Sequence, residues 1–508
     1  MAGGVNRAVG RVELAGVVAL TLLLLGTLLA IDRLAPDGRT FIKVVGIDSR
    51  NYYAVTHSVL FDRDFDLTNQ YEVLGRPESE WLATVEATGL PASPWPIGFP
   101  LLQAPLLALG TLLDAEQDGF GPWARHLYFV GLSLQIGVGL FFLLRLLGDV
   151  RRALGLAASP VVSLGVVALV LFGTNLFYYA FFAMSHAASF CMSAAFLSCW
   201  FRLRDDRRLG AWMGLGALAG LMVLVRWQSA LFVLVFPGLH ELARLVREPS
   251  ALRARAGSRL AAAAVAAVVF APQLVQWQQV YGSWMLVPQG QDFVQWPPRH
   301  VLDVLLSTRH GWFVWTPLTG FGVAGLALAV RRLPLLATQA LLAISLQVLL
   351  IGSLPVAWFN PDSFGIRMLI ATLPLVGVGL AVLAWTVTPR VRLGMALVGL
   401  LLVVWTGLFA VQFALDLVPP DERLTARELF VDKVRLDQAW GRKRAQVAAA
   451  RLVESGQASE AVAVVRSALT RVGPGLQLVD VLVDACQGAD CAEEAAELRA
   501  RFEERRLP

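Results

Sequence analysis

The stretch LAGVVALTLLLLGTLLAI, residues 14–31, decides the fold class. It contains no charged residue, and a helix of about 20 residues suffices to cross the hydrocarbon core of a membrane. Arg7 and Arg11 precede it and Asp32-Arg33 follow directly. The apolar block is longer than that of a secretory signal, so we interpret it as a retained anchor with a cytoplasmic N-terminus.

The composition extends this interpretation to the whole chain. Of its 508 residues, 56% are hydrophobic and 16% are charged, whereas soluble proteins carry about 25% charged residues. The apolar excess occurs in blocks of span length, which excludes a soluble enzyme, a disordered protein and a small disulfide-stapled fold. The net charge of +5 reflects basic loops between apolar blocks, so no nucleic-acid partner is expected.

We predict an all-α, polytopic membrane protein with about eleven transmembrane helices. After the first, the predicted spans begin near His126, Pro160, Ala187, Leu209, Ser229, Leu260, Gly311, Pro334, Met368 and Leu393. This topology places arginine-rich loops inside and loops with more acidic than basic residues outside, as the positive-inside rule requires. It predicts a multi-pass protein of the plasma (inner) membrane with an external C-terminal tail.

The external loop 32–125 is too long for a simple connector. Its apolar part, near 97–113, carries Pro100 and Pro105 and is preceded by Pro96. Prolines disfavour a straight spanning helix. We therefore predict a helix that lies at the membrane surface.

The polar tail, residues 419–508, follows the membrane domain, residues 1–418. The stretch Ala445–Ala468 is typical of two short helices around Gly456, similar to one tetratricopeptide hairpin. The tail also holds Cys486 and Cys491. In an oxidising compartment these two could form a disulfide, and two free thiols on a helix are the alternative.

Ionisable and aromatic side chains gather at the predicted outer ends of the spans rather than at loop tips. Ionisable groups at a membrane boundary usually line a polar cavity, so the sequence indicates one external site built from several loops. No phosphate-binding glycine loop, zinc-spaced Cys/His cluster or nucleotide fingerprint occurs. The charged candidates of this set are Arg226, Arg299, Arg309, Asp362 and Arg367, with His57, His126, His186, His300 and His310.

Short motifs then follow one another in a recognisable order. They are Asp48 after the first span, Trp95-Pro96 to Pro100, Ala124-Arg125, Met184-Ser185-His186-Ala187, Leu224 to Gln228, Ser307 to Gly311, Trp315-Thr316-Pro317 and Asp362 to Arg367. Over residues 10–415 this order resembles the polytopic membrane glycosyltransferases of the C superfamily. These GT-C enzymes include the protein O-mannosyltransferases and the lipid A aminoarabinose transferases.

The resemblance implies a glycosyltransferase that moves a sugar from a polyprenyl-phosphate-linked donor to an extracytoplasmic acceptor by inverting displacement. The acceptor would be a glycan, a lipid or a protein. Asp48 takes the place of the catalytic carboxylate, and such transfer needs a base for the acceptor proton. The alternative is that Asp48 caps a surface helix. Many mannosyltransferases of this superfamily have Asp-Glu where this chain has Asp48-Ser49, which argues against a close match to those enzymes.

The remaining candidates would bind substrate. Arginine at an outer span end suits the departing phosphate, although an interfacial anchor would look the same. Aromatic rings could stack on a sugar or simply pack. The predicted substrate-binding residues are Tyr52, Tyr53, Arg226, Arg309, His310, Asp362 and Arg367.

Asp62, Asp64 and Asp66 alternate along the first external loop. On an extended strand all three would face one side, and their oxygens could bind a divalent cation. The alternative is a solvated acidic loop, and no other cofactor is expected.

Two other functions fit a polytopic chain. A glycan polymerase or ligase of related architecture would share most of these features. A non-enzymatic lipid or solute transporter often shows internal repeats and polar pairs near mid-membrane. The charges of this chain lie at one face instead, and no repeat is evident.

Overall fold

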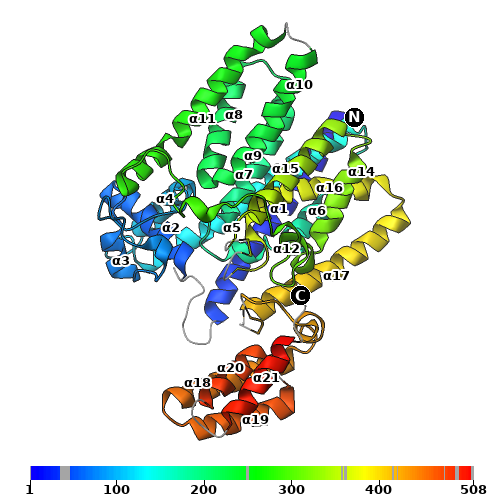
Figure 1. Ribbon diagram of the computed structural model, residues 1–508. Helices are drawn as coiled ribbons and strands as arrows, with labels where there is room; N and C mark the ends of the chain where they lie inside the picture. The colour runs from blue at the N-terminus through cyan, green and yellow to red at the C-terminus, as the bar shows by residue number, and fades with distance from the viewer. Residues whose placement is uncertain are drawn as a thin grey trace.

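The structure, a computed structural model, describes residues 2–34, 46–247, 251–355, 358–359, 363–414, 417–419, 421–473, 475–486 and 491–504. The predicted site residue Asp362 lies outside these ranges. Figure 1 shows a bundle of long helices with a separate group of four helices at the C-terminal end. No β-strand is present in these residues, so the predicted all-α class is confirmed.

Seven helical segments are long and apolar enough to cross a membrane. This makes the chain a multi-pass membrane protein. The seven segments are Gly10–Ala30 in α1 (Ala2–Leu34), α5 (Pro122–Ala153), Trp227–Arg247, Arg255–Tyr281 in α11 (Ala251–Tyr281), α15 (Pro334–Gly352), Arg367–Thr386 and α17 (Pro389–Ala414).

The other four predicted spans coincide with helices that are too short or not apolar enough to count as membrane spans, so the count of eleven stays a prediction. They are α6 (Pro160–Phe172), α7 (His186–Leu203), α8 (Leu209–Val225) and the pair α13 (Trp312–Trp315) and α14 (Leu318–Ala329). The segment Trp227–Arg247 consists of η4 (Trp227–Ser229), α9 (Ala230–Val233), η5 (Leu234–Gly238) and α10 (Leu239–Arg247). The segment Arg367–Thr386 joins η7 (Arg367–Thr372) to α16 (Leu373–Thr386).

The two ends of the bundle differ (Figure 1). One end, called here the loop end, carries α2 (Ile47–His57), α3 (Thr68–Leu74) and α4 (Gly98–Thr111). The N-terminus and the start of α11 lie at the opposite end. Helix α4 falls where a surface helix was predicted, contains Pro105, and packs against α2 and α5.

The expectation of an extended strand through Asp62, Asp64 and Asp66 is wrong. Residues Ser58–Asp62 form a wide helical turn, and Arg63 then adopts a left-handed conformation with φ 63°. The chain reverses there because Ser58 binds Asp64, its hydroxyl donating to the carboxylate over 2.7 Å.

Helices α14 and α16 approach each other through glycines. A Cβ added to Gly379 would lie 1.9 Å from the carbonyl oxygen of Gly322, and one added to Gly325 would lie 2.2 Å from that of Gly379. Small residues permit such backbone contact between membrane helices. Since η7 leads directly into α16, this contact helps to fix where Arg367 stands.

The C-terminal helices are α18 (Leu436–Glu454), α19 (Ala458–Val472), α20 (Leu476–Ala485) and α21 (Ala492–Glu504). They bury an apolar core of their own that includes Val465, Leu478 and Leu482. Gly456, with φ 78°, makes the turn between α18 and α19. Cys486 and Cys491 form a disulfide, so the free-thiol alternative does not apply.

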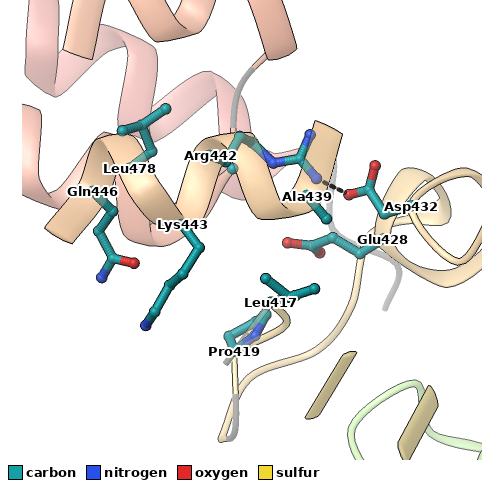
Figure 2. A pocket seen from close by; sticks show the side chains of 10 residues that line it. Leu417, Pro419, Glu428, Asp432, Ala439, Arg442, Lys443, Gln446 and Leu478 are labelled. Atoms are coloured by element: carbon teal, nitrogen blue, oxygen red, sulfur yellow. Dashed lines mark hydrogen bonds and ion pairs between the residues drawn. The ribbon is translucent and has the colours of Figure 1, made fainter. Parts of the chain in front are cut away.

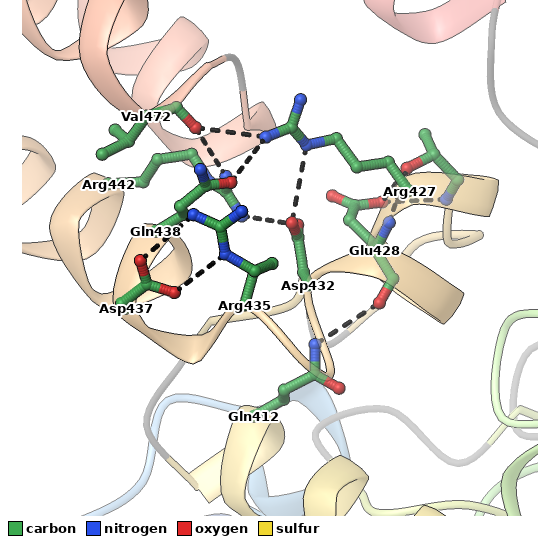
Figure 3. Close-up of polar contacts among 10 residues, drawn as sticks. Gln412, Arg427, Glu428, Asp432, Arg435, Asp437, Gln438, Arg442 and Val472 are labelled. Carbon is green, nitrogen blue, oxygen red and sulfur yellow. Dashed lines mark hydrogen bonds and ion pairs between the residues drawn. The ribbon is translucent and has the colours of Figure 1, made fainter.

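A buried polar network connects these helices to the last span (Figure 3). Asp432 accepts from Arg442 at 2.5 Å and pairs with Arg427 at 3.5 Å. Both arginines also donate to the carbonyl oxygen of Val472 at the end of α19. Gln412 of α17 donates to the carbonyl oxygen of Glu428 at 3.3 Å. The hollow beside this network holds about 20 Å³ (Figure 2), which is room for one water molecule.

Candidate active site

Segments far apart in the sequence enclose one cavity of about 280 Å³ at the loop end. Its charged lining consists of Asp48 from α2, Arg226 after α8 and Arg367 at the start of η7. Two arginines thus face one carboxylate, which leaves an excess of positive charge. Such a cavity favours an anionic group in its bound ligand.

Asp48 lies in the first turn of α2, whose N-cap is Gly46. Its Oδ2 stands 3.0 Å from Nη2 of Arg367, and each of the two side chains is 13% exposed. Within the described residues no main-chain N–H of α2 donates to the Asp48 carboxylate. The carboxylate lies at the cavity and pairs with Arg367.

Arg226 is held by the start of α7. Its Nη1 donates to Oγ of Ser185 at 3.2 Å and lies 3.0 Å from Nδ1 of His186. Ser185 also accepts a hydrogen bond of 3.1 Å from the hydroxyl of Tyr52. Ser185 is therefore the common acceptor that joins α2, α7 and the end of α8 beneath the cavity.

A glycine turn positions Arg367. Gly365 has φ +65°, which side-chain-bearing residues rarely adopt, and the N–H of Arg367 donates back to its carbonyl oxygen at 2.9 Å. The guanidinium also lies 3.1 Å from the sulfur of Met184. This turn directs the side chain toward Asp48.

The rest of the cavity wall is largely apolar. Gln228 and Gln347 exchange hydrogen bonds and so hold η4 against α15. The cavity therefore has a charged floor and a hydrophobic side, as a ligand with an anionic head and an apolar chain requires. The apolar residues are Trp81, Trp95, Pro96, Trp227, Val287, Phe293, Val294, Leu350, Ile351, Leu354 and Met368.

The two candidate tyrosines of α2 point in different directions. Tyr52 lines the cavity, and burial raises the pKa of its hydroxyl to about 12, so it stays protonated and donates to Ser185. Tyr53 is fully buried, and its hydroxyl donates to the carbonyl oxygen of Gly119 at 2.6 Å. The structure thus brings Tyr52 to the site and gives Tyr53 a packing position.

Arg309 and His310 do not line this cavity. The guanidinium of Arg309 lies 3.3 Å over the ring of Phe359. His310 is fully buried, contacts the carbonyl oxygen of Phe359, and packs its ring 4.8 Å from Trp315. The structure therefore groups these two with Phe359 and separates them from Asp48.

The three acidic candidates for a cation site have separate partners. Asp62 accepts from Asn69 and Gln70, Asp64 from Ser58, and Asp66 from Thr68. No group of three or more His, Cys, Asp or Glu side chains suited to a metal ion occurs in the described ranges. Their hydrogen bonds stabilise the turns around α3.

Several cavity residues were not predicted from the sequence. Gln228 in the lining and Ser185 beneath it lie inside motifs that the sequence did indicate, and only their neighbours were chosen. Gln289 and Phe293 belong to a long loop after α11, where no periodicity points to a position. The only feature of the sequence that points to these two residues is the high density of Trp, Phe and Gln between residues 284 and 296.

Among solved structures, the chain is similar to ArnT from Cupriavidus metallidurans in the apo state. The TM-score is 0.51 at 15% sequence identity, over 96% of this chain and 77% of that one. The chain has the GT-C membrane fold. The predicted resemblance is thereby confirmed at the level of the fold.

Two structures of the Archaeoglobus fulgidus oligosaccharyltransferase are also similar, one in the apo form and one tethered with an acceptor peptide. Their TM-scores are 0.44 and 0.46, at 10% and 13% identity. They match 79% of this chain and 56% and 55% of their own length. No family model and no curated protein matches the sequence.

Proposed function

We propose that this protein is a membrane glycosyltransferase whose active site is the cavity around Asp48. One observation carries the proposal: a carboxylate and two arginines share a cavity with an extended apolar wall. The fold supports it, since the similar ArnT has the same architecture.

The donor in this proposal is a sugar linked to a polyprenyl phosphate. Arg226 and Arg367 would bind the phosphate, and planar guanidinium groups suit its oxygens. The apolar wall formed by residues such as Trp95, Phe293 and Leu354 would contact the first isoprene units. The donor thereby matches both halves of the cavity lining.

Asp48 would act as the general base. It takes the proton of the acceptor hydroxyl or amine while that group attacks the anomeric carbon. The bond between the anomeric carbon and the phosphate oxygen breaks, and its electron pair leaves with the polyprenyl phosphate. Arg367, which already binds Asp48, would bridge the base and the phosphate and so orient both. The single displacement inverts the anomeric configuration.

The topology supports an extracytoplasmic site in the plasma membrane. Arginine-rich connections such as Arg202–Arg208 and Arg244–Arg247 belong to the end opposite the cavity. The positive-inside rule assigns that end to the cytoplasm. The acceptor is then a glycan, a lipid or a protein outside the cell membrane.

The test measures transfer from labelled polyprenyl-phosphate sugars to envelope acceptors, using full-length protein in lipid nanodiscs. Asp48→Asn removes the base and should lower the rate by about 100- to 10,000-fold. Glu72→Gln is the matched control, since Glu72 is exposed on α3 and should leave the rate unchanged. Wild-type turnover by Asp48→Asn would remove Asp48 from the mechanism, and no transfer from any polyprenyl-phosphate sugar would refute the donor class.

A further inference from the structure

A second cavity, of about 360 Å³, lies between α1, α5 and α7 at the end of the bundle opposite Asp48. It is lined by four arginines, two of which, Arg151 and Arg152, lie in the last turn of α5. The four are Arg145, Arg151, Arg152 and Arg202, and Glu13 of α1 lines the cavity with them. Its residues take no part in the chemistry proposed for the first cavity.

The positive charge of this cavity is only half compensated by the described residues. Asp149 pairs with both Arg152 and Arg202. Glu13 interacts electrostatically with Arg151 and Arg152. Four guanidinium groups thus face two carboxylates, so the cavity favours a ligand that carries negative charge.

Arg151 shows that this ligand would have a specific contact. Its side chain is only 7% exposed, and its Nε and Nη1 are buried with no hydrogen-bond partner among the described residues. Buried polar groups in native proteins are nearly always hydrogen-bonded. An acceptor that enters the cavity would supply the missing partner, and arginine binds phosphate oxygens with well-directed, charge-assisted bonds.

The surroundings of the cavity indicate a lipid as the source of the phosphate. Leu14 lines the cavity, and on the same helix Leu14, Val18 and Leu22 are 48%, 49% and 61% exposed. An acyl chain can lie along this apolar face of α1 while its headgroup reaches the arginines. A free phosphate ion would use only the polar part of the cavity.

We propose that this cavity binds the phosphate of an anionic phospholipid from the membrane leaflet opposite the Asp48 site. Arg151 contacts the phosphate directly, with Arg145 beside it, and α1 receives the acyl chain. The site ties the first helix to α5 and α7 through a lipid molecule.

Native mass spectrometry of the full-length protein with added phosphatidylglycerol tests the proposal. Arg151→Gln should weaken the affinity for this lipid by about tenfold. Arg331→Gln is the matched control, because Arg331 is exposed and outside the cavity, and it should change the affinity less than twofold. Equal affinities in the two variants and the wild type would overturn the proposal.

Two further arms keep the test decisive. If Arg151→Gln does not fold, Arg145→Gln replaces it, because Arg145 is exposed on α5. A loss of lipid affinity in that variant supports the proposal, and an unchanged affinity overturns it. Inorganic phosphate alone, without lipid, should not compete with phosphatidylglycerol. Full competition by inorganic phosphate would assign the site to a free anion and overturn the lipid.

Discussion

Two aspartates of this protein each face two arginines, and their surroundings differ sharply. Asp48 pairs with Arg367 and interacts with Arg226 at the border of a cavity of about 280 Å³. Both members of the Asp48–Arg367 pair keep 13% of their side chain exposed. All three side chains line the cavity.

Asp432 forms the second group, with Arg442 and Arg427, in the closed junction of Figure 3. The side chains of Asp432 and Arg442 are 1% and 7% exposed. Donors of both arginines are used by the carbonyl oxygen of Val472. The same three charges thus line a cavity of about 280 Å³ in one place and connect helices beside a hollow of only about 20 Å³ in the other.

The largest effect is expected at the first group. Arg226→Gln removes one cation from the proposed phosphate site and should lower kcat/KM by about 100-fold. The thermal unfolding midpoint should fall only slightly, because the glutamine amide can still donate to Ser185 as Arg226 does. Arg63→Gln, an exposed arginine of the same loop region, serves as the control in the transfer assay. If Arg226→Gln lost much stability but kept a normal kcat/KM, the proposed difference between the Asp48 group and the Asp432 group would be wrong.

At the group around Asp432, a substitution should lower the stability of the fold rather than the rate of transfer. Asp432→Asn leaves Arg442 buried without its counter-charge and should cost about 3 kcal/mol, seen as faster proteolysis of the C-terminal helices. Asp437→Asn breaks the exposed pair with Arg435 and should leave the stability nearly unchanged. Similar losses in the two variants would show that the buried network does not hold the junction.

Lys433 lies next to that junction and gives it a pH dependence. Its side chain is 2% exposed, its ammonium packs over the ring of Trp405, and burial lowers its pKa from 10.5 to about 5. Between those values the folded state is neutral while the unfolded state is charged. The free-energy cost of folding with Lys433 in its neutral form is therefore absent above pH 10.5, and it grows as the pH falls below that value.

Lys433→Met should raise the stability by about 2 kcal/mol at pH 7, and the gain should vanish as the pH approaches 10.5. Thermal unfolding at several pH values measures this, with Lys443→Met as the control. A gain that does not depend on pH would indicate packing rather than ionisation.

The smallest effect is expected at Ser185, which accepts from both Tyr52 and Arg226. Ser185→Ala should weaken donor binding by about fivefold, the loss of about 1 kcal/mol in positioning. It should act on KM while kcat stays close to wild type. A loss in kcat alone would mean that the hydroxyl contacts the reacting groups.

The sequence indicated which candidate residues lie near the ends of spans, but it did not indicate how they group. Asp48, Arg226, Arg309 and Arg367 all follow or precede an apolar block, so hydropathy places them near one membrane surface. It does not say which side of a helix end each one faces. Arg309 consequently shares the predicted depth yet packs against Phe359.

The buried junction around Asp432 could not be predicted from the sequence for a different reason. Asp432 and Arg442 lie in a polar tail, where charged residues are normally solvated. Their burial depends on how η8 (Arg427–Val431) packs between α17 and α18, which no local pattern encodes. The Gly456 turn and the helices around it, by contrast, follow from local sequence and are present.

The glycine contact between α14 and α16 affects the geometry of the proposed active site, although the contact lies outside the cavity. Gly379 lies twelve positions after Arg367, about 18 Å along the helical path. A methyl group at Gly379 would collide with the backbone of α14 and would therefore change the tilt of α16. Arg367, at the other end of this segment, would then move away from Asp48. A substitution within a membrane-spanning helix should therefore lower the proposed transferase activity at the cavity.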